Sequence, residues 1–125
     1  MSEKNKVLVE ARPHYIEAQS LPEQNRFVFA YTITITNVGL VAARLMTRHW
    51  IITDANGKVQ EVNGEGVVGE HPYLQPGDSF RYTSAAMIET PVGVMQGQYR
   101  MQSDLGESFS APIPRFTLSI PRILH

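Results

Sequence analysis

The chain has 125 residues, 42% of them apolar, which is enough for one hydrophobic core over residues 1–125 without disulfides or a structural metal. Eleven basic and twelve acidic residues give a net charge of −1, so a nucleic-acid partner is not expected. Since cysteine is absent and no apolar run approaches the ~20 residues of a membrane span, we expect a cytoplasmic protein without a thiolate nucleophile, a cysteine zinc site or membrane contact.

The first predicted strands are Val7–Glu10 and Phe27–Asn37, and the second is the clearest strand of the sequence. In it, large apolar residues alternate with smaller or polar ones, the period of a strand with one buried face. The alternation directs five side chains into the core: Phe27, Phe29, Tyr31, Ile33 and Ile35. Nothing in this strand discourages pairing if it lies at an edge, so a homodimer through an exposed strand or a sheet face is predicted.

The next two predicted strands, Arg44–Thr53 and Lys58–Val62, form a hairpin. Asn56-Gly57 between them tolerates positive φ at both centres of a two-residue turn. Trp50 is expected in the core between the sheets. Arg48 lies on the same face as Trp50, which indicates that this face is only partly covered or that the arginine extends to its rim.

The last three predicted strands are Phe80–Met87, Gly97–Ser103 and Phe116–Ile120. Pro112, Pro114 and Pro121 remove ladder donors, so the last strand is expected to be bulged or to lie at an edge. Tyr99 is expected to form a tyrosine corner, with its hydroxyl bonded to backbone a few residues upstream. About seven short strands favour an all-β sandwich of immunoglobulin or fibronectin type III kind, with a small barrel as the alternative.

The connection after the hairpin contains Gly64-x-Gly66-x-x-Gly69, the glycine spacing of a phosphate-binding loop. Pro72 follows closely, so no helix can begin there and a dinucleotide fold is excluded. In the favoured interpretation the glycines supply positive φ, and three apolar residues pack inward: Val67, Val68 and Leu74. In the alternative, the loop amides form a phosphate nest together with three arginines: Arg44, Arg48 and Arg81.

Other site chemistry is poorly supported. The four histidines never occur at metal-ligand spacing. Ser84 lies in a predicted strand and lacks the glycine partners of a nucleophile elbow. We therefore expect no metal, no cofactor and no catalytic residue.

Several motifs in order closely resemble the bacterial ApaG family. They are Arg48–Asp54, Gly64–Gly69, Phe80-x-Tyr82-Thr83-Ser84, Pro91-x-Gly93-x-Met95-x-Gly97-x-Tyr99 and Ile113-Pro114-x-Phe116-x-Leu118. The resemblance covers nearly the whole chain and implies a fibronectin type III-like sandwich. It also implies a proposed pyrophosphate-binding role for Gly64, Gly66 and Gly69.

The same resemblance implies an association with magnesium and cobalt tolerance. Bacterial members of the family are encoded beside a dinucleoside tetraphosphate hydrolase and an rRNA adenine dimethyltransferase. Eukaryotic relatives carry the domain in F-box proteins and a DNA-polymerase-interacting protein, where it resembles an interaction module. The expected function is therefore non-catalytic binding of another protein, with binding of a phosphorylated small molecule such as a dinucleoside polyphosphate as the alternative.

Overall fold

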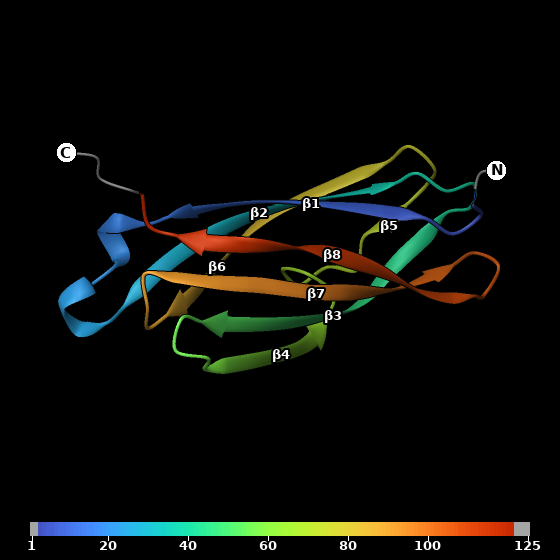
Figure 1. Cartoon of the computed structure of the whole chain (residues 1–125). Helices are drawn as coiled ribbons and strands as arrows, with labels where there is room; N and C mark the ends of the chain where they lie inside the picture. The colour runs from blue at the N-terminus through green and yellow to red at the C-terminus, as the bar shows by residue number, and fades with distance from the viewer. Residues whose placement is uncertain (1–2, 122–125) are drawn as a thin grey trace.

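The structure is a computed structural model that describes residues 3–121. Its strands are β1 (Val7–Tyr15), β2 (Phe27–Asn37), β3 (Ala43–Asp54), β4 (Val59–Glu65), β5 (Tyr73–Leu74), β6 (Ser79–Ile88), β7 (Val92–Ser103) and β8 (Ser108–Ser119). Two antiparallel sheets, β1-β2-β6 and β4-β3-β7-β8, pack face to face, and β5 pairs with β3 (Figure 1). The all-β sandwich is therefore confirmed.

Every predicted strand is present, although several bounds differ. β2 has the predicted bounds, whereas β1, β7 and β8 are longer than the sequence indicated. The two-residue β5 and two 3₁₀ helices, η1 (Glu17–Gln19) and η2 (Pro22–Gln24), were not predicted. Within residues 3–121, no helix has the length and apolarity needed to cross a membrane.

The core lies between the two sheets and is centred on aromatic side chains. The five predicted inward residues of β2 are all buried, and Ile33 is 0% exposed. Trp50 is also buried, with its ring centroid 5.3 Å from that of Tyr31 and 6.0 Å from that of Phe116. The inward face of β2 and the core position of Trp50 are therefore confirmed.

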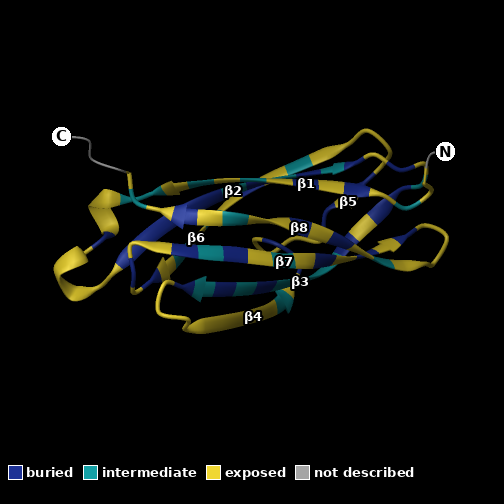
Figure 2. Cartoon of the chain, viewed as in Figure 1, coloured by how far each residue is buried: buried dark blue, intermediate teal, exposed yellow. Residues whose placement is uncertain are grey.

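The sandwich is closed on one side and open on the other. β1 and β8 lie side by side and bring the two sheets together there (Figure 1). β8 is an edge strand with a register shift opposite Met95 and Gly97, as its prolines predicted. β4 and β6 are the edges on the opposite side, and Figure 2 shows that β4 is mostly exposed.

The route proposed for a homodimer is wrong. β2 pairs with β1 on one side and with β6 on the other, so the Phe27–Asn37 strand has no free edge. Association through another edge or a sheet face stays a prediction.

The predicted tyrosine corner is also wrong. Tyr99 is 0% exposed, but its hydroxyl lies 2.5 Å from the hydroxyl of Tyr82 on β6 and not against upstream backbone. The two side chains thus join the sheets across the core. Burial raises the pKa of Tyr82 to about 12 and also raises the pKa of Tyr99, so both hydroxyls stay protonated at neutral pH.

Replacing Tyr99 by phenylalanine is expected to destabilise the protein by roughly 1–3 kcal/mol, because the buried Tyr82 hydroxyl loses its partner. The double change Tyr82→Phe and Tyr99→Phe should cost less than the sum of the two single changes, since it leaves no orphaned hydroxyl. Urea unfolding of the four proteins measures this coupling. Strict additivity would show that the two hydroxyls do not depend on each other.

Candidate binding groove

The second half of the glycine loop is a tight hairpin turn. The amide of Val67 donates to the carbonyl of Glu70 at 2.8 Å, and the amide of Glu70 donates back to the carbonyl of Val67 at 2.9 Å. Val68 and Gly69, the two central residues, both have positive φ, at 44° and 80°. Positive φ at both centres is the signature of a type I′ turn.

Each glycine of the motif has its own structural reason. Gly66 has a φ of 59°, and a Cβ added to it would lie 2.1 Å from the Glu70 carbonyl oxygen. Gly69 supplies the second positive φ of the turn. Gly64 lies in β4, where an added Cβ would lie 2.5 Å from the guanidinium carbon of Arg48. The prediction of positive φ is confirmed at Gly66 and Gly69.

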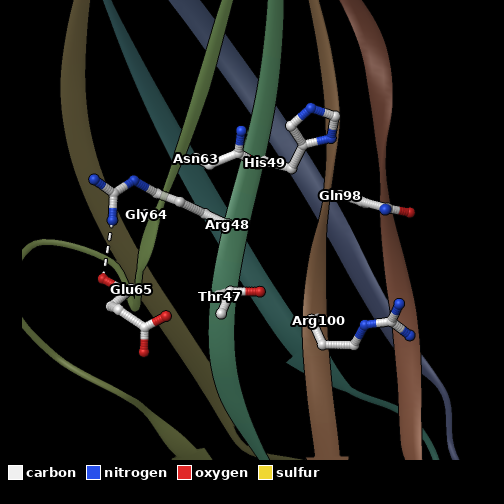
Figure 3. A pocket seen from close by; sticks show the side chains of 8 residues that line it. All are labelled: Thr47, Arg48, His49, Asn63, Gly64, Glu65, Gln98 and Arg100. Carbon is white, nitrogen blue, oxygen red and sulfur yellow. Dashed lines mark hydrogen bonds between the residues drawn. The ribbon is translucent and has the colours of Figure 1, made fainter.

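Arg48 is the predicted arginine that reaches the loop. Figure 3 shows its side chain extending across Gly64 toward the backbone of Glu65. Its Nη1 donates to the carbonyls of Glu65 and Gly66, each at 2.9 Å. The Gly66 amide donates to the Met46 carbonyl and the Val67 amide donates to the Glu70 carbonyl. These two loop amides are therefore bonded within the fold, and it is loop carbonyls that contact Arg48.

The other two predicted arginines lie elsewhere. Arg44 donates from Nη1 to the His71 carbonyl at 2.9 Å, just beyond the loop, and its guanidinium lies 5.0 Å from the centre of the Tyr73 ring. Arg81 is exposed on the face of β6 that points away from the core. The structure therefore brings one arginine of the three onto the glycine loop.

The predicted packing of the loop is only partly correct. Val67 and Leu74 are buried, but Val68 is 54% exposed at the tip of the turn. Val68 is one of the two central residues of the turn, beyond the paired backbone of Val67 and Glu70. A β-branched residue at positive φ is an outlier, and such strain gathers at functional sites.

Replacing Val68 by asparagine is expected to stabilise the protein by roughly 1 kcal/mol, because Asn-Gly is the preferred pair for this turn and asparagine tolerates the left-handed region. Chemical unfolding measures the change. The matched control is Val59→Asn, which alters an equally exposed valine in β4 with no positive φ. A Val68→Asn protein no more stable than the natural one would show that the valine carries no strain.

A groove runs along the open side of the sandwich. Two hollows of about 340 and 300 Å³ lie between the edges of β4 and β6. They share four lining residues: Tyr31, Arg48, Trp50 and Ser84. Because Arg48 borders both, the two hollows form one groove with an aromatic floor and a cation at its middle, which we call the β4–β6 groove.

The two halves of the β4–β6 groove both combine apolar and polar residues, and the second, which Glu65 and Ser84 also line, is the more polar. One hollow continues over Ile52, Val62 and Met87, and the other continues over Val67, Val68 and Tyr82. Arg48 therefore lies between two groups of apolar side chains, and the strained Val68 belongs to the second. The partial covering that Arg48 indicated in the sequence is confirmed.

A second, polar depression of about 460 Å³ lies on the outer face of β3, β4 and β7. Figure 3 shows Gln98 and Arg100 on the opposite side of β3 from the Arg48 guanidinium. His49 in this depression contacts Glu61, with Nε2 and Oε1 2.7 Å apart. Among residues 3–121, no group of three or more histidine, aspartate or glutamate side chains is arranged to hold a metal ion.

Comparison with known proteins gives one consistent family. The family described as the ApaG domain matches residues 17–103. Protein ApaG of Azoarcus sp. strain BH72 is 59% identical over 99% of this chain and 98% of that protein. Protein ApaG of Thiobacillus denitrificans is 56% identical over 98% of this chain and 96% of its own. A crystal structure of a Bordetella pertussis protein described as ApaA superposes with a TM-score of 0.95 at 45% identity, covering 98% of this chain and 100% of that one.

Proposed function

Because the chain belongs to the ApaG domain family, we propose that it is a non-catalytic binding module that docks an extended segment of another protein in the β4–β6 groove. The observation that carries this proposal is the meeting of two unpaired strand edges above one floor of aromatic side chains. Free edges supply backbone hydrogen bonds to an added strand, and pockets beside them supply side-chain selection.

The chemistry of the groove supports binding over catalysis. The Tyr82 and Tyr99 hydroxyls are bonded to each other, and their raised pKa keeps them protonated. Arg48 uses Nη1 on two backbone carbonyls. Neither arrangement provides the general base beside a nucleophile that group transfer requires.

The strained Val68 supports the same function. An exposed valine at positive φ costs stability, and asparagine would fit the turn better. Its place at the border of the groove gives a reason for that cost, because an apolar side chain there extends the surface that a partner would cover.

The test is selection of displayed random 12-residue peptides on the full chain, followed by titration of a synthetic selected peptide. The Val68→Asn protein is a sharp control, since it should be more stable and yet bind the peptide about fivefold more weakly. Amide resonances of β6 and of residues 66–70 should shift on binding. No enriched peptide, or shifts confined to another face, would overturn the proposal.

A phosphorylated small molecule is the second candidate ligand. The polar depression favours it, because Arg100 and Gln98 line a space of suitable size beside Gly64. The test is to titrate pyrophosphate and diadenosine tetraphosphate while following the amides of Gly64–Gly69 and Arg100. Saturable shifts that disappear in Arg100→Gln would support this candidate, and unchanged resonances at millimolar ligand would remove it.

The cellular setting follows from the same proposal. A chain without cysteine needs no oxidising compartment, which supports binding in the cytoplasm. The link of the family to magnesium and cobalt tolerance would then run through the bound partner and not through an ion held by this chain.

A further inference from the structure

Two strand edges flank the groove, and the edge of β6 is less protected against pairing with another strand than the edge of β4. Exposed edges are normally blunted by charges, prolines or bulges. β1 and β8 both carry prolines, at Pro13, Pro112 and Pro114, and β4 carries Glu61 and Glu65. The stretch Tyr82–Ile88 of β6 has neither a charge nor a proline, and its middle consists of small residues.

Part of the backbone of β6 is directed toward the groove. The side chain of Gln60 donates to the Met87 carbonyl across the groove at 3.4 Å, so this carbonyl points away from β2. Residues of an edge strand alternate in the side to which their amide and carbonyl point. The amides and carbonyls of Thr83 and Ala85 therefore also point toward the groove, where they form a row of hydrogen-bonding sites for a partner strand.

Arg48 gives the groove a charge that is unmatched within the described chain. No carboxylate among residues 3–121 lies within 4.0 Å of its guanidinium. Its bonds to Glu65 and Gly66 both come from Nη1, so the side formed by Nε and Nη2 is left for a ligand. That side can hold a carboxylate with two parallel hydrogen bonds.

From these observations we infer that β6 receives an extended segment of a partner protein with the pattern apolar–x–acidic–x–apolar, its carboxylate held by Arg48. A strand beside β6 would lie about 4.8 Å from it, over the groove, and would direct every second side chain to the floor. The middle side chain then meets Arg48, and its neighbours two residues away meet the apolar side chains of the two hollows, Val62 and Met87 in one and Val67 and Val68 in the other. The pattern reads the same in both directions, so it holds for a parallel or an antiparallel segment.

This inference rests on the proposed function and sharpens its ligand. The peptide selection described above should enrich one aspartate or glutamate with apolar residues two positions before and after it. A synthetic selected peptide is then compared with a version in which the acid is replaced by its amide. The amide version should bind the natural chain about tenfold more weakly, and the difference should vanish in Arg48→Gln.

Two controls separate this mechanism from others. Arg48→Lys keeps the charge without the fork geometry and should recover only part of the preference for the acid. A peptide methylated at the backbone nitrogens that face β6 should lose binding without any change to the protein, because it cannot pair with the strand edge.

The outcomes distinguish the inference from the proposal beneath it. If no peptide is enriched, the proposed function itself fails. Three other results would show that the module binds protein segments but would overturn this inference. One is that the enriched peptides contain no acidic residue, and another is that the preference for the acid over its amide is the same in Arg48→Gln as in the natural chain. The third such result is that the peptide with the methylated backbone still binds. A self-derived segment of the chain that competes with the peptide would assign the groove to a second copy and would also overturn it.

Discussion

Replacing Gly66 by alanine is expected to destabilise the protein by about 3 kcal/mol or more, the largest effect in the glycine motif. Two penalties combine at this position. Its φ of 59° is disfavoured for a residue with a Cβ, and that Cβ would lie 2.1 Å from the Glu70 carbonyl oxygen. The carbonyl belongs to the turn backbone, so relief requires the hairpin between Val67 and Glu70 to move.

The other two glycines are matched controls for this effect. Gly69→Ala should cost only about 1 kcal/mol, because φ is positive there but the space for a Cβ is empty. Gly64→Ala meets the flexible end of Arg48, so it should displace the guanidinium with little loss of stability and weaken peptide binding instead. Urea unfolding ranks the three proteins. If Gly66→Ala and Gly69→Ala lose the same stability, the contact of a Cβ with the Glu70 carbonyl oxygen is not the reason for a glycine at position 66.

The sequence predicted strands well where one periodic signal dominated. β2 was found with its bounds because its inward residues repeat every second position. A turn after β3 was found from Asn56-Gly57, but the predicted two-residue turn is wrong: only Gly57 has positive φ, and the amide of Asp54 donates to the Lys58 carbonyl, so three residues join the strands. The early part of β8 was missed because Pro112 and Pro114 argue against a strand, although an edge strand need not donate from every residue.

The predicted start of β7 was wrong because of a glycine. The sequence predicts a strand that begins at Gly97, yet Gly97 lies inside β7, where an added Cβ would lie 2.0 Å from the His49 carbonyl oxygen. The same residue type therefore marks a turn at Gly69 and close packing of two backbones at Gly97. A single sequence cannot separate these two uses, because the second depends on which strand pairs with which.

The candidate site was predictable only in part. Alternation in β3 placed Arg48 on the face of Trp50 and indicated an incompletely covered face. The groove itself depends on the distance between β4 and β6, which belong to different sheets and whose separation leaves no local sequence signal. The contact of Tyr82 with Tyr99 was missed for the same reason, since it requires the register of two sheets at once.

Replacing Ile33 by alanine is expected to destabilise the protein by about 2–5 kcal/mol, because the side chain is 0% exposed in the central strand of its sheet and its removal leaves a cavity. The matched control is Thr34→Ala, one residue further along β2 and on its outward face, which should change stability by less than about 1 kcal/mol. Chemical unfolding of both proteins measures the difference. The binding groove should survive in the Ile33 variant wherever it remains folded, since Ile33 does not line it. A loss below about half a kcal/mol for Ile33→Ala, or one equal to that of Thr34→Ala, would show that β2 does not turn this face toward the core.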